Sequence, residues 1–218
     1  MDGSSRRLFQ EESRIHDNLD KMVRMAKQEL ASALMALESQ DTDQAEVTVD
    51  SDVDLHNLYR IIEGECLQVL ALQQPVARDL REIIGSLQVA GELERIGGHA
   101  KDIAKIVLGM DPSDFSGPMD RILRMGDLVV TMLEQVGEAV LNKNDDLART
   151  AAAEDDEVDE LDQEAVADLM MQLAIAPDTH MHSTHLLWIA YHLERVGDRV
   201  RHIAERVVFM VSSDQVEL

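Results

Sequence analysis

Apolar residues along the chain recur every three or four positions, which is the spacing of one face of an amphipathic helix. The first such stripe runs from Ile15 to Leu37. No segment shows the strict alternation of apolar and polar residues that is typical of a half-buried strand. The pattern therefore predicts a protein built from helices.

The same stripe occurs a second time, without a gap, in the other half of the chain. The matching positions, first copy named first, are Leu19 and Ile122, Met22 and Met125, Ala26 and Val129, Leu30 and Leu133, Ala33 and Val136, and Leu37 and Val140. Polar residues suited to N-caps, Asp41 and Asn144, follow each copy, and a proline, Pro75 or Pro177, ends each following segment. Self-similarity of this kind is the mark of a repeat architecture.

We therefore expect an all-α fold, a tandem repeat of two three-helix bundles. The six long helices are predicted at about 8–39, 43–74, 76–108, 118–142, 146–176 and 180–212. A segment dense in glycine, proline and serine at 109–118 separates the halves, so we place the two repeats at 1–111 and 112–218. The halves are expected to pack together, since single repeats rarely bury all their apolar surface.

Composition narrows the class of partner. The 43 acidic and 20 basic residues give a formal charge of −23, which disfavours direct nucleic-acid binding and docking on anionic lipid. Hydrophobic residues make up 45%, as in globular proteins, and the single cysteine, Cys66, excludes an internal disulfide. No apolar stretch is long enough for a transmembrane segment, and the N-terminus lacks an apolar signal region. We expect a cytoplasmic protein.

Acidic residues four positions apart are the candidate chemistry. Side chains at i and i+4 stand on the same face of a helix, and two carboxylates there repel each other unless a cation lies between them. Such pairs flank the apolar stripes at matching places in both repeats, where adjacent helices would present them to a shared surface groove. Both residues are acidic in Asp155/Asp159 and Glu194/Asp198, and the corresponding pairs of the first repeat are Asp52/His56 and Glu94/Gly98.

Two interpretations of these pairs stay open. Carboxylates and imidazole are ligands for iron or zinc, and an all-oxygen set also suits magnesium or calcium. The candidate metal ligands are Asp155, Asp159, Glu194, Asp198, Asp52, His56 and Glu94. The alternative is a set of ordinary solvated acidic flanks in an acid-rich chain.

Other single residues have simpler roles. Cys66 lies on an apolar stripe, which predicts a buried, unreactive thiol. Gly97 and Gly197 lie inside helices, where a glycine points to the close approach of another helix. Arg95 and Arg195 are expected to pair with neighbouring acids. The sequence contains no P-loop, no Gly-x-Ser-x-Gly and no His-Glu-x-x-His motif, so we do not expect an enzyme.

Three segments resemble the PhoU family, the accessory proteins of phosphate-specific transport systems. The segment 70–81, LALQQPVARDLR, is similar to the family's bend between the second and third helices. The segments 92–97, ELERIG, and 192–198, HLERVGD, resemble its paired third-helix motifs. The order of segments matches from near the start of the chain to about residue 212.

The resemblance implies two three-helix bundles side by side and a negative regulator of phosphate uptake and of the phosphate-starvation response. It implies a cytoplasmic adaptor, expected here as a homodimer, that contacts the ATP-binding subunit of the phosphate transporter and a membrane sensor histidine kinase. Some family members carry iron or zinc clusters on Glu/Asp-x-x-x-Asp motifs. The second repeat matches that motif with Asp155, Asp159, Glu194 and Asp198.

The first repeat departs from the motif. His56 stands where an acid is usual, and Gly98 replaces the expected aspartate. Lys105 takes the place of Glu205 in the other repeat, and its charge would oppose cation binding, with His99 and Asp102 as candidate compensating ligands.

The histidines at 180, 182 and 185 are interpreted as part of a polar turn and helix start. Two other functions remain open: a helical metal-binding or storage protein, and a metal-free structural dimer. A buried di-iron site is disfavoured, because no Glu-x-x-His motif occurs in the sequence.

Overall fold

The computed structural model describes residues 3–111, 119–175, 180–213 and 216–218. The first bundle contains α1 (Gly3–Ser39), α2 (Thr42–Gln73) and α3 (Ala77–Leu108). The second contains α4 (Met119–Asn142), α5 (Asp145–Ala153), α6 (Asp155–Ile175) and α7 (His180–Ser212). The described residues form helices and no strands, which confirms the predicted all-α fold of two three-helix bundles.

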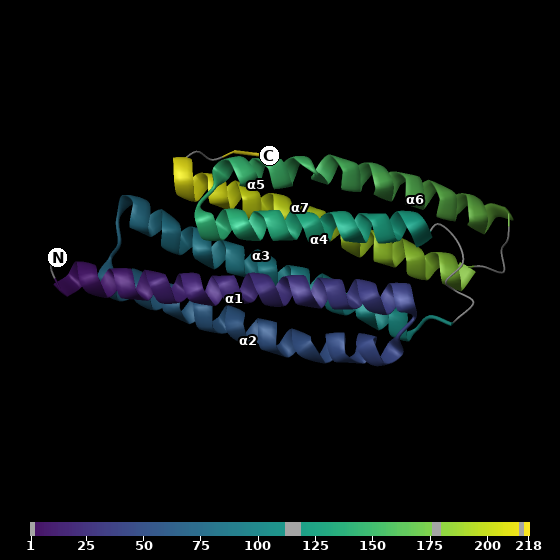
Figure 1. Cartoon of the computed structure of the whole chain (residues 1–218), viewed down its shortest axis with the longest axis horizontal. Helices are drawn as coiled ribbons and strands as arrows, with labels where there is room; N and C mark the ends of the chain where they lie inside the picture. The colour runs from purple at the N-terminus through teal and green to yellow at the C-terminus, as the bar shows by residue number, and fades with distance from the viewer. Residues whose placement is uncertain (1–2, 112–118, 176–179, 214–215) are drawn as a thin grey trace.

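The two bundles lie side by side with their helices roughly parallel or antiparallel (Figure 1). Helices α1 and α3 of the first bundle pack against α4 and α7 of the second, whereas α2 and the α5–α6 pair lie at the outer edges (Figure 1). Buried residues of both halves belong to one continuous hydrophobic core. The repeats are therefore halves of one packed unit, as their shared need to bury apolar surface predicts.

The bundles approach closely where α1 meets α4. A methyl group built on Gly137 of α4 would collide with Val23 of α1, and one built on Gly126 would collide with Leu34. Glycine at these positions lets the two helix backbones come together while the core stays dense.

The turn after the first helix is copied in both repeats. Gln40 and Lys143 both adopt left-handed backbone conformations, with φ of 57° and 52°. The next residue caps the following helix: Asp41 accepts a hydrogen bond from the Gln44 amide at 3.0 Å, and Asn144 accepts one from the Leu147 amide at 3.1 Å. Both predicted N-caps are confirmed, and the repeat extends to backbone geometry.

The predicted helix at 146–176 is interrupted. Helix α5 ends at Ala153 and α6 begins at Asp155, with Glu154 between them. At this break the Glu157 amide donates to the Glu154 carbonyl at 3.1 Å, a three-residue turn tighter than that of an α-helix. The prediction of one unbroken helix was wrong here, because a local tightening of this kind leaves the apolar spacing intact.

Some sequence expectations fall outside the described residues. These are the segment 112–118, which contains the second side of the expected repeat boundary, and the bend at 176–179 with Pro177. Within the described helices, none is long and apolar enough to cross a membrane.

Candidate functional site

The acidic residues of the second repeat come together where α6 begins beside α7. The first turn of α6 contains Asp155, Asp156 and Glu157. Carboxylates are favoured at this end of a helix, because the backbone amide groups of the first turn carry a partial positive charge. The break at Glu154 thus gives Asp155 a helix N-terminus that an unbroken helix would not provide.

Asp155 is buried, with only 5% of its surface exposed. The sequence predicted it beside the apolar stripe, facing a surface groove, and the expected surface position was wrong. The physical reason is Gly197 on α7: a methyl group built there would collide with Oδ1 of Asp155, so the glycine makes the space that the carboxylate fills. The predicted role of Gly197 in a close helix approach is confirmed.

Burial raises the pKa of Asp155 to about 6. This value already includes the opposing effect of the Arg201 guanidinium, which lowers the pKa, and the smaller effects of the Asp159, Asp198 and Glu194 carboxylates, which raise it. Because these groups influence one another's charge, all four predicted second-repeat residues lie in one electrostatic neighbourhood. The structure links Asp155, Glu194 and Asp198 through shared arginines, and the charge of the exposed Asp159 also acts on Asp155.

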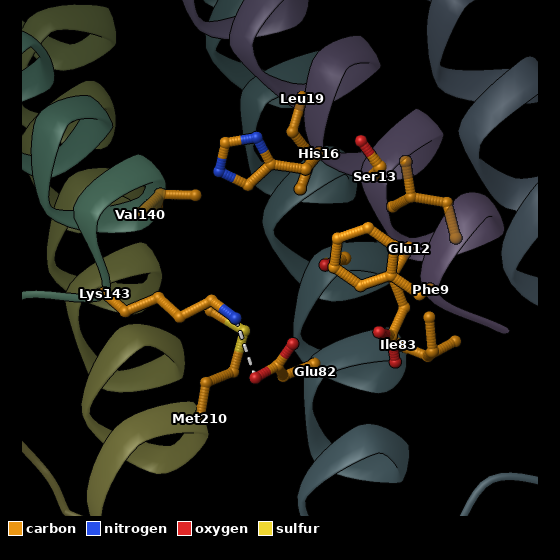
Figure 2. Close-up of a pocket in the computed structure, with 12 residues that line it drawn as sticks. Phe9, Glu12, Ser13, His16, Leu19, Glu82, Ile83, Val140, Lys143 and Met210 are labelled. Atoms are coloured by element: carbon orange, nitrogen blue, oxygen red, sulfur yellow. Dashed lines mark ion pairs between the residues drawn. The ribbon is translucent and has the colours of Figure 1, made fainter. Parts of the chain in front are cut away.

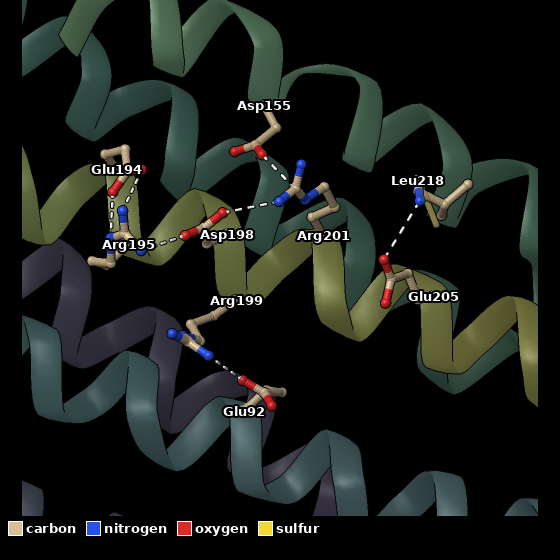
Figure 3. Close-up of polar contacts among 9 residues, drawn as sticks. All are labelled: Glu92, Asp155, Glu194, Arg195, Asp198, Arg199, Arg201, Glu205 and Leu218. Carbon is tan, nitrogen blue, oxygen red and sulfur yellow. Dashed lines mark hydrogen bonds and ion pairs between the residues drawn. The ribbon is translucent and has the colours of Figure 1, made fainter. Parts of the chain in front are cut away.

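Two arginines bridge three of these acids into an alternating chain of charges (Figure 3). Arg195 contacts Glu194 through Nε at 2.6 Å and Asp198 through Nη1 at 3.0 Å. Arg201 contacts Asp198 through Nη2 at 3.1 Å and Asp155 through Nε at 3.6 Å. The expected pairing of Arg195 with neighbouring acids is confirmed.

The first repeat has a different arrangement at the equivalent positions. Lys101 donates through Nζ to Asp52 at 2.6 Å, and this hydrogen bond raises the pKa of Lys101. His56 donates through Nδ1 to Glu94 at 3.0 Å. The three predicted residues Asp52, His56 and Glu94 are thus held in two separate pairs, one of which already contains a cation.

Lys105 was predicted to be the basic residue near this first site, but the structure places Lys101 there. Lys105 pairs with Asp102 of its own helix at 3.0 Å, while Lys101 reaches Asp52. His99, considered as a compensating ligand, lies beside His192 of the other bundle, with 3.1 Å between their Nδ1 atoms. Which partner each of these side chains contacts depends on how the helices pack, and the spacing along one helix does not predict it.

The basic partners were missed, although a signal was present. Lys101 follows Glu94 by two helical turns, and Arg201 follows Glu194 in the same way. Residues two turns apart lie on the same face of a helix. A basic residue at the same position in α3 and α7 predicts an ion pair with an acid of the neighbouring helix, α2 or α6.

Glu29 of α1 was also missed. It is 5% exposed, its Oε2 atom has no hydrogen-bond partner, and this atom would lie 2.8 Å from a methyl carbon built on Gly97. Burial and the nearby Asp52 carboxylate raise the pKa of Glu29 to about 7. Comparison of the two repeats could have identified this residue, because Glu29 interrupts the apolar stripe where the second copy has Met132.

Two further expectations are confirmed. Cys66 is fully buried, and burial raises the pKa of its thiol to about 12. Arg95 pairs with Glu92 at 2.6 Å, and Arg199 of α7 reaches the same Glu92 at 3.4 Å (Figure 3). Glu92 thereby links the two bundles on the polar side of their junction.

The donor chemistry of the second repeat suits a cation better than that of the first. Three of its four carboxylates are joined by shared arginines, and one of them fills a space that a Cβ would close. Across the part of the chain that the structure describes, however, no three acidic, histidine or cysteine residues are arranged to hold one metal ion. A metal at the second-repeat site would have to displace the guanidinium groups that bridge the acids.

We predict that Glu29 makes the stability of the protein depend on pH. Because its pKa in the folded state lies above the ordinary value of 4.5, the folded protein binds the extra proton, and stability falls as pH rises from about 4.5 through 7. In the wild type this decline in the free energy of unfolding should be on the order of 2–3 kcal/mol. The variant Glu29→Gln should not show it. Urea unfolding followed by helical circular dichroism at several pH values measures it.

The matched control is Glu38→Gln, which removes an exposed carboxylate from the same helix. Its pH profile should run parallel to that of the wild type. If the Glu29→Gln profile also runs parallel, then Glu29 does not hold its proton in the folded protein.

Comparison with known proteins agrees with this geometry over both repeats. The family model described as the PhoU domain matches residues 19–107 and 122–207. The phosphate-specific transport system accessory protein PhoU homolog of Clostridium acetobutylicum is 30% identical over 216 residues, which cover 98% of this chain and 99% of that protein. The homolog of Caulobacter vibrioides is 32% identical, over 90% of this chain and 86% of its own.

Solved structures show the same fold. The crystal structure of the phosphate transport system regulatory protein PhoU from Streptococcus pneumoniae superposes with a TM-score of 0.87 at 27% identity, covering 97% of this chain and all of that one (100%). PhoU from Pseudomonas aeruginosa also gives a TM-score of 0.87, at 28% identity and with 94% of this chain covered and 98% of that one. The chain therefore belongs to the PhoU family.

Proposed function

We propose that this protein is a regulatory accessory protein of phosphate-specific transport and is not an enzyme. The observation that carries the proposal is that the family match includes both repeats and spans nearly the whole chain. In this role it is a cytoplasmic homodimer that represses phosphate uptake and the phosphate-starvation response. It does so as an adaptor between the ATP-binding subunit of the transporter and the sensor histidine kinase.

The charge of the molecule supports recognition through protein partners. With a formal charge of −23, the surface repels both nucleic-acid phosphates and anionic lipid headgroups. Complementary charge speeds the encounter of protein partners and excludes wrong ones. We therefore assign the link to the membrane to contacts with the transporter and the kinase.

Deletion of the protein in its own host tests the regulatory proposal. We expect phosphate-starvation genes to be expressed in phosphate-rich medium and phosphate uptake to rise, with both effects reversed by the wild-type chain. A tagged wild-type chain should also co-purify with the ATP-binding subunit and with the kinase. If starvation genes stay repressed and neither partner is recovered, the regulatory proposal is wrong.

We also propose that iron or zinc, when it is bound, is held by the second repeat. Asp155, Asp159, Glu194 and Asp198 supply carboxylate oxygens within one neighbourhood, and Gly197 leaves room for the first of them. The first repeat is a poorer site, because the Lys101 ammonium already neutralises Asp52. Metal and the bridging arginines would compete for the same acids.

The metal proposal predicts a loss of bound metal in a double variant. Wild-type protein equilibrated with iron or zinc and freed of excess ion should retain metal, and Asp155→Ala with Asp159→Ala should retain at least about tenfold less at the same free ion concentration, since two ligands are removed. Elemental analysis by plasma mass spectrometry measures the ratio.

The matched control is Asp156→Ala with Glu160→Ala, which removes two exposed acids at the same spacing from the same helix. This variant should keep the wild-type metal content. Equal metal in both double variants, or none in the wild type, would overturn the metal proposal and leave the regulatory one standing. Retained metal without any regulatory effect would instead favour a storage protein.

A further inference from the structure

A cavity of about 220 Å³ lies at the junction of the two bundles, apart from the acidic site described above. Its walls come from α1 and α3 of the first repeat and from the end of α4 and α7 of the second (Figure 2). The apolar lining consists of Phe9, Ile15, Leu19, Ile83, Val140 and Met210. An apolar cavity of about 150 Å³ in another protein holds benzene, so this one has room for a ring with a short arm.

One side of the cavity is acidic. Glu12 of α1 and Glu82 of α3 line it, and Lys143 reaches across from just beyond α4 (Figure 2). Lys143 contacts Glu82 through Nζ at 2.7 Å, and Arg78 donates to the same carboxylate at 2.9 Å. Both nearby cations are therefore already engaged by Glu82.

Glu12 has a buried oxygen, Oε1, without a hydrogen-bond partner. Burial raises the pKa of Glu12, and the carboxylates of Asp79 and Glu82 raise it further, against the opposing effect of Lys143 and Arg78. A buried acceptor of this kind costs free energy until it is hydrogen-bonded. Because this atom is closed to solvent, a ligand would meet the rest of the side chain, where a positive charge would offset the excess of Glu12, Asp79 and Glu82 over Lys143 and Arg78.

We propose that this cavity binds a small organic cation, with an ammonium group facing the acidic wall at Glu12 and Glu82 and a compact apolar body against the lining residues. An anionic ligand is disfavoured, because the Lys143 ammonium is held by Glu82 and the charged groups around Glu12 are mostly carboxylates. The ligand would contact both repeats, so its binding would hold them together at this end of the junction. The inference does not depend on the proposed regulatory function.

Calorimetric titration of the full-length protein with phenethylamine tests the proposal. We expect saturable binding of one molecule per chain, and binding of phenylacetate at least about tenfold weaker, because the two probes share an apolar body and differ in the sign of their charge. No saturable binding of phenethylamine, or equal binding of phenylacetate, would overturn the proposal.

Three variants locate the site. Glu12→Gln should weaken phenethylamine binding at least about tenfold through loss of the charged acceptor. Ser86→Leu keeps every charge but fills the cavity that Ser86 lines, and it should abolish binding. Asp17→Asn removes an exposed acid of α1 outside the lining and should leave the affinity within about twofold of wild type. Circular dichroism confirms that each variant is folded, and undiminished binding in folded Glu12→Gln or Ser86→Leu refutes this location.

Discussion

The site depends on one kind of interaction, an ion pair between an acid of α2 or α6 and a base of the neighbouring helix, α3 or α7. In the second repeat it joins Asp155 to Arg201, and in the first it joins Asp52 to Lys101. Removing a carboxylate from water is costly unless a positive partner or hydrogen bonds compensate. In a chain with a formal charge of −23, such partners are scarce, so where they lie affects which buried acids stay ionised, and Glu29, whose buried oxygen has no hydrogen-bond partner, has a pKa raised to about 7.

The two repeats solve this problem differently, and the difference bears on function. Arg195 and Arg201 connect three acids of the second repeat, whereas Lys101 neutralises a single acid of the first. A planar guanidinium with several donors bridges neighbouring carboxylates, while an ammonium acts as a compact point charge. The second repeat therefore holds three carboxylates on two shared arginines, and the first holds a single acid in a salt bridge with a lysine.

Helix positions followed from the sequence because apolar spacing, N-caps and prolines all report on local structure, and the duplication supplied each signal twice. The close approach at Gly197 was also predictable, since a glycine inside a helix needs a packing reason. The sequence did not predict which group fills the space beside Gly197. Whether Asp155 lies in solvent or against α7 depends on the break at Glu154 and on how two helices pack, which the spacing along one helix does not record.

The errors among charged residues have the same origin. Lys105 was expected to be the base that opposes the first site, yet a long side chain can pair within its own helix or across to another, and it is Lys101 that contacts Asp52. Glu29 was visible in principle as a polar residue in an apolar stripe. Comparison with its copy, Met132, shows that this acid belongs to the first repeat alone.

A double-mutant cycle on Asp155→Asn and Arg201→Gln tests directly whether acid and base are coupled across the helices. The free energy of unfolding of wild type, both single variants and the double variant, from urea titration near neutral pH, gives the coupling energy. We expect at least about 1 kcal/mol, because the carboxylate is buried and its partner neutralises it. Effects that add to within about 0.3–0.5 kcal/mol would contradict the central place given to this ion pair.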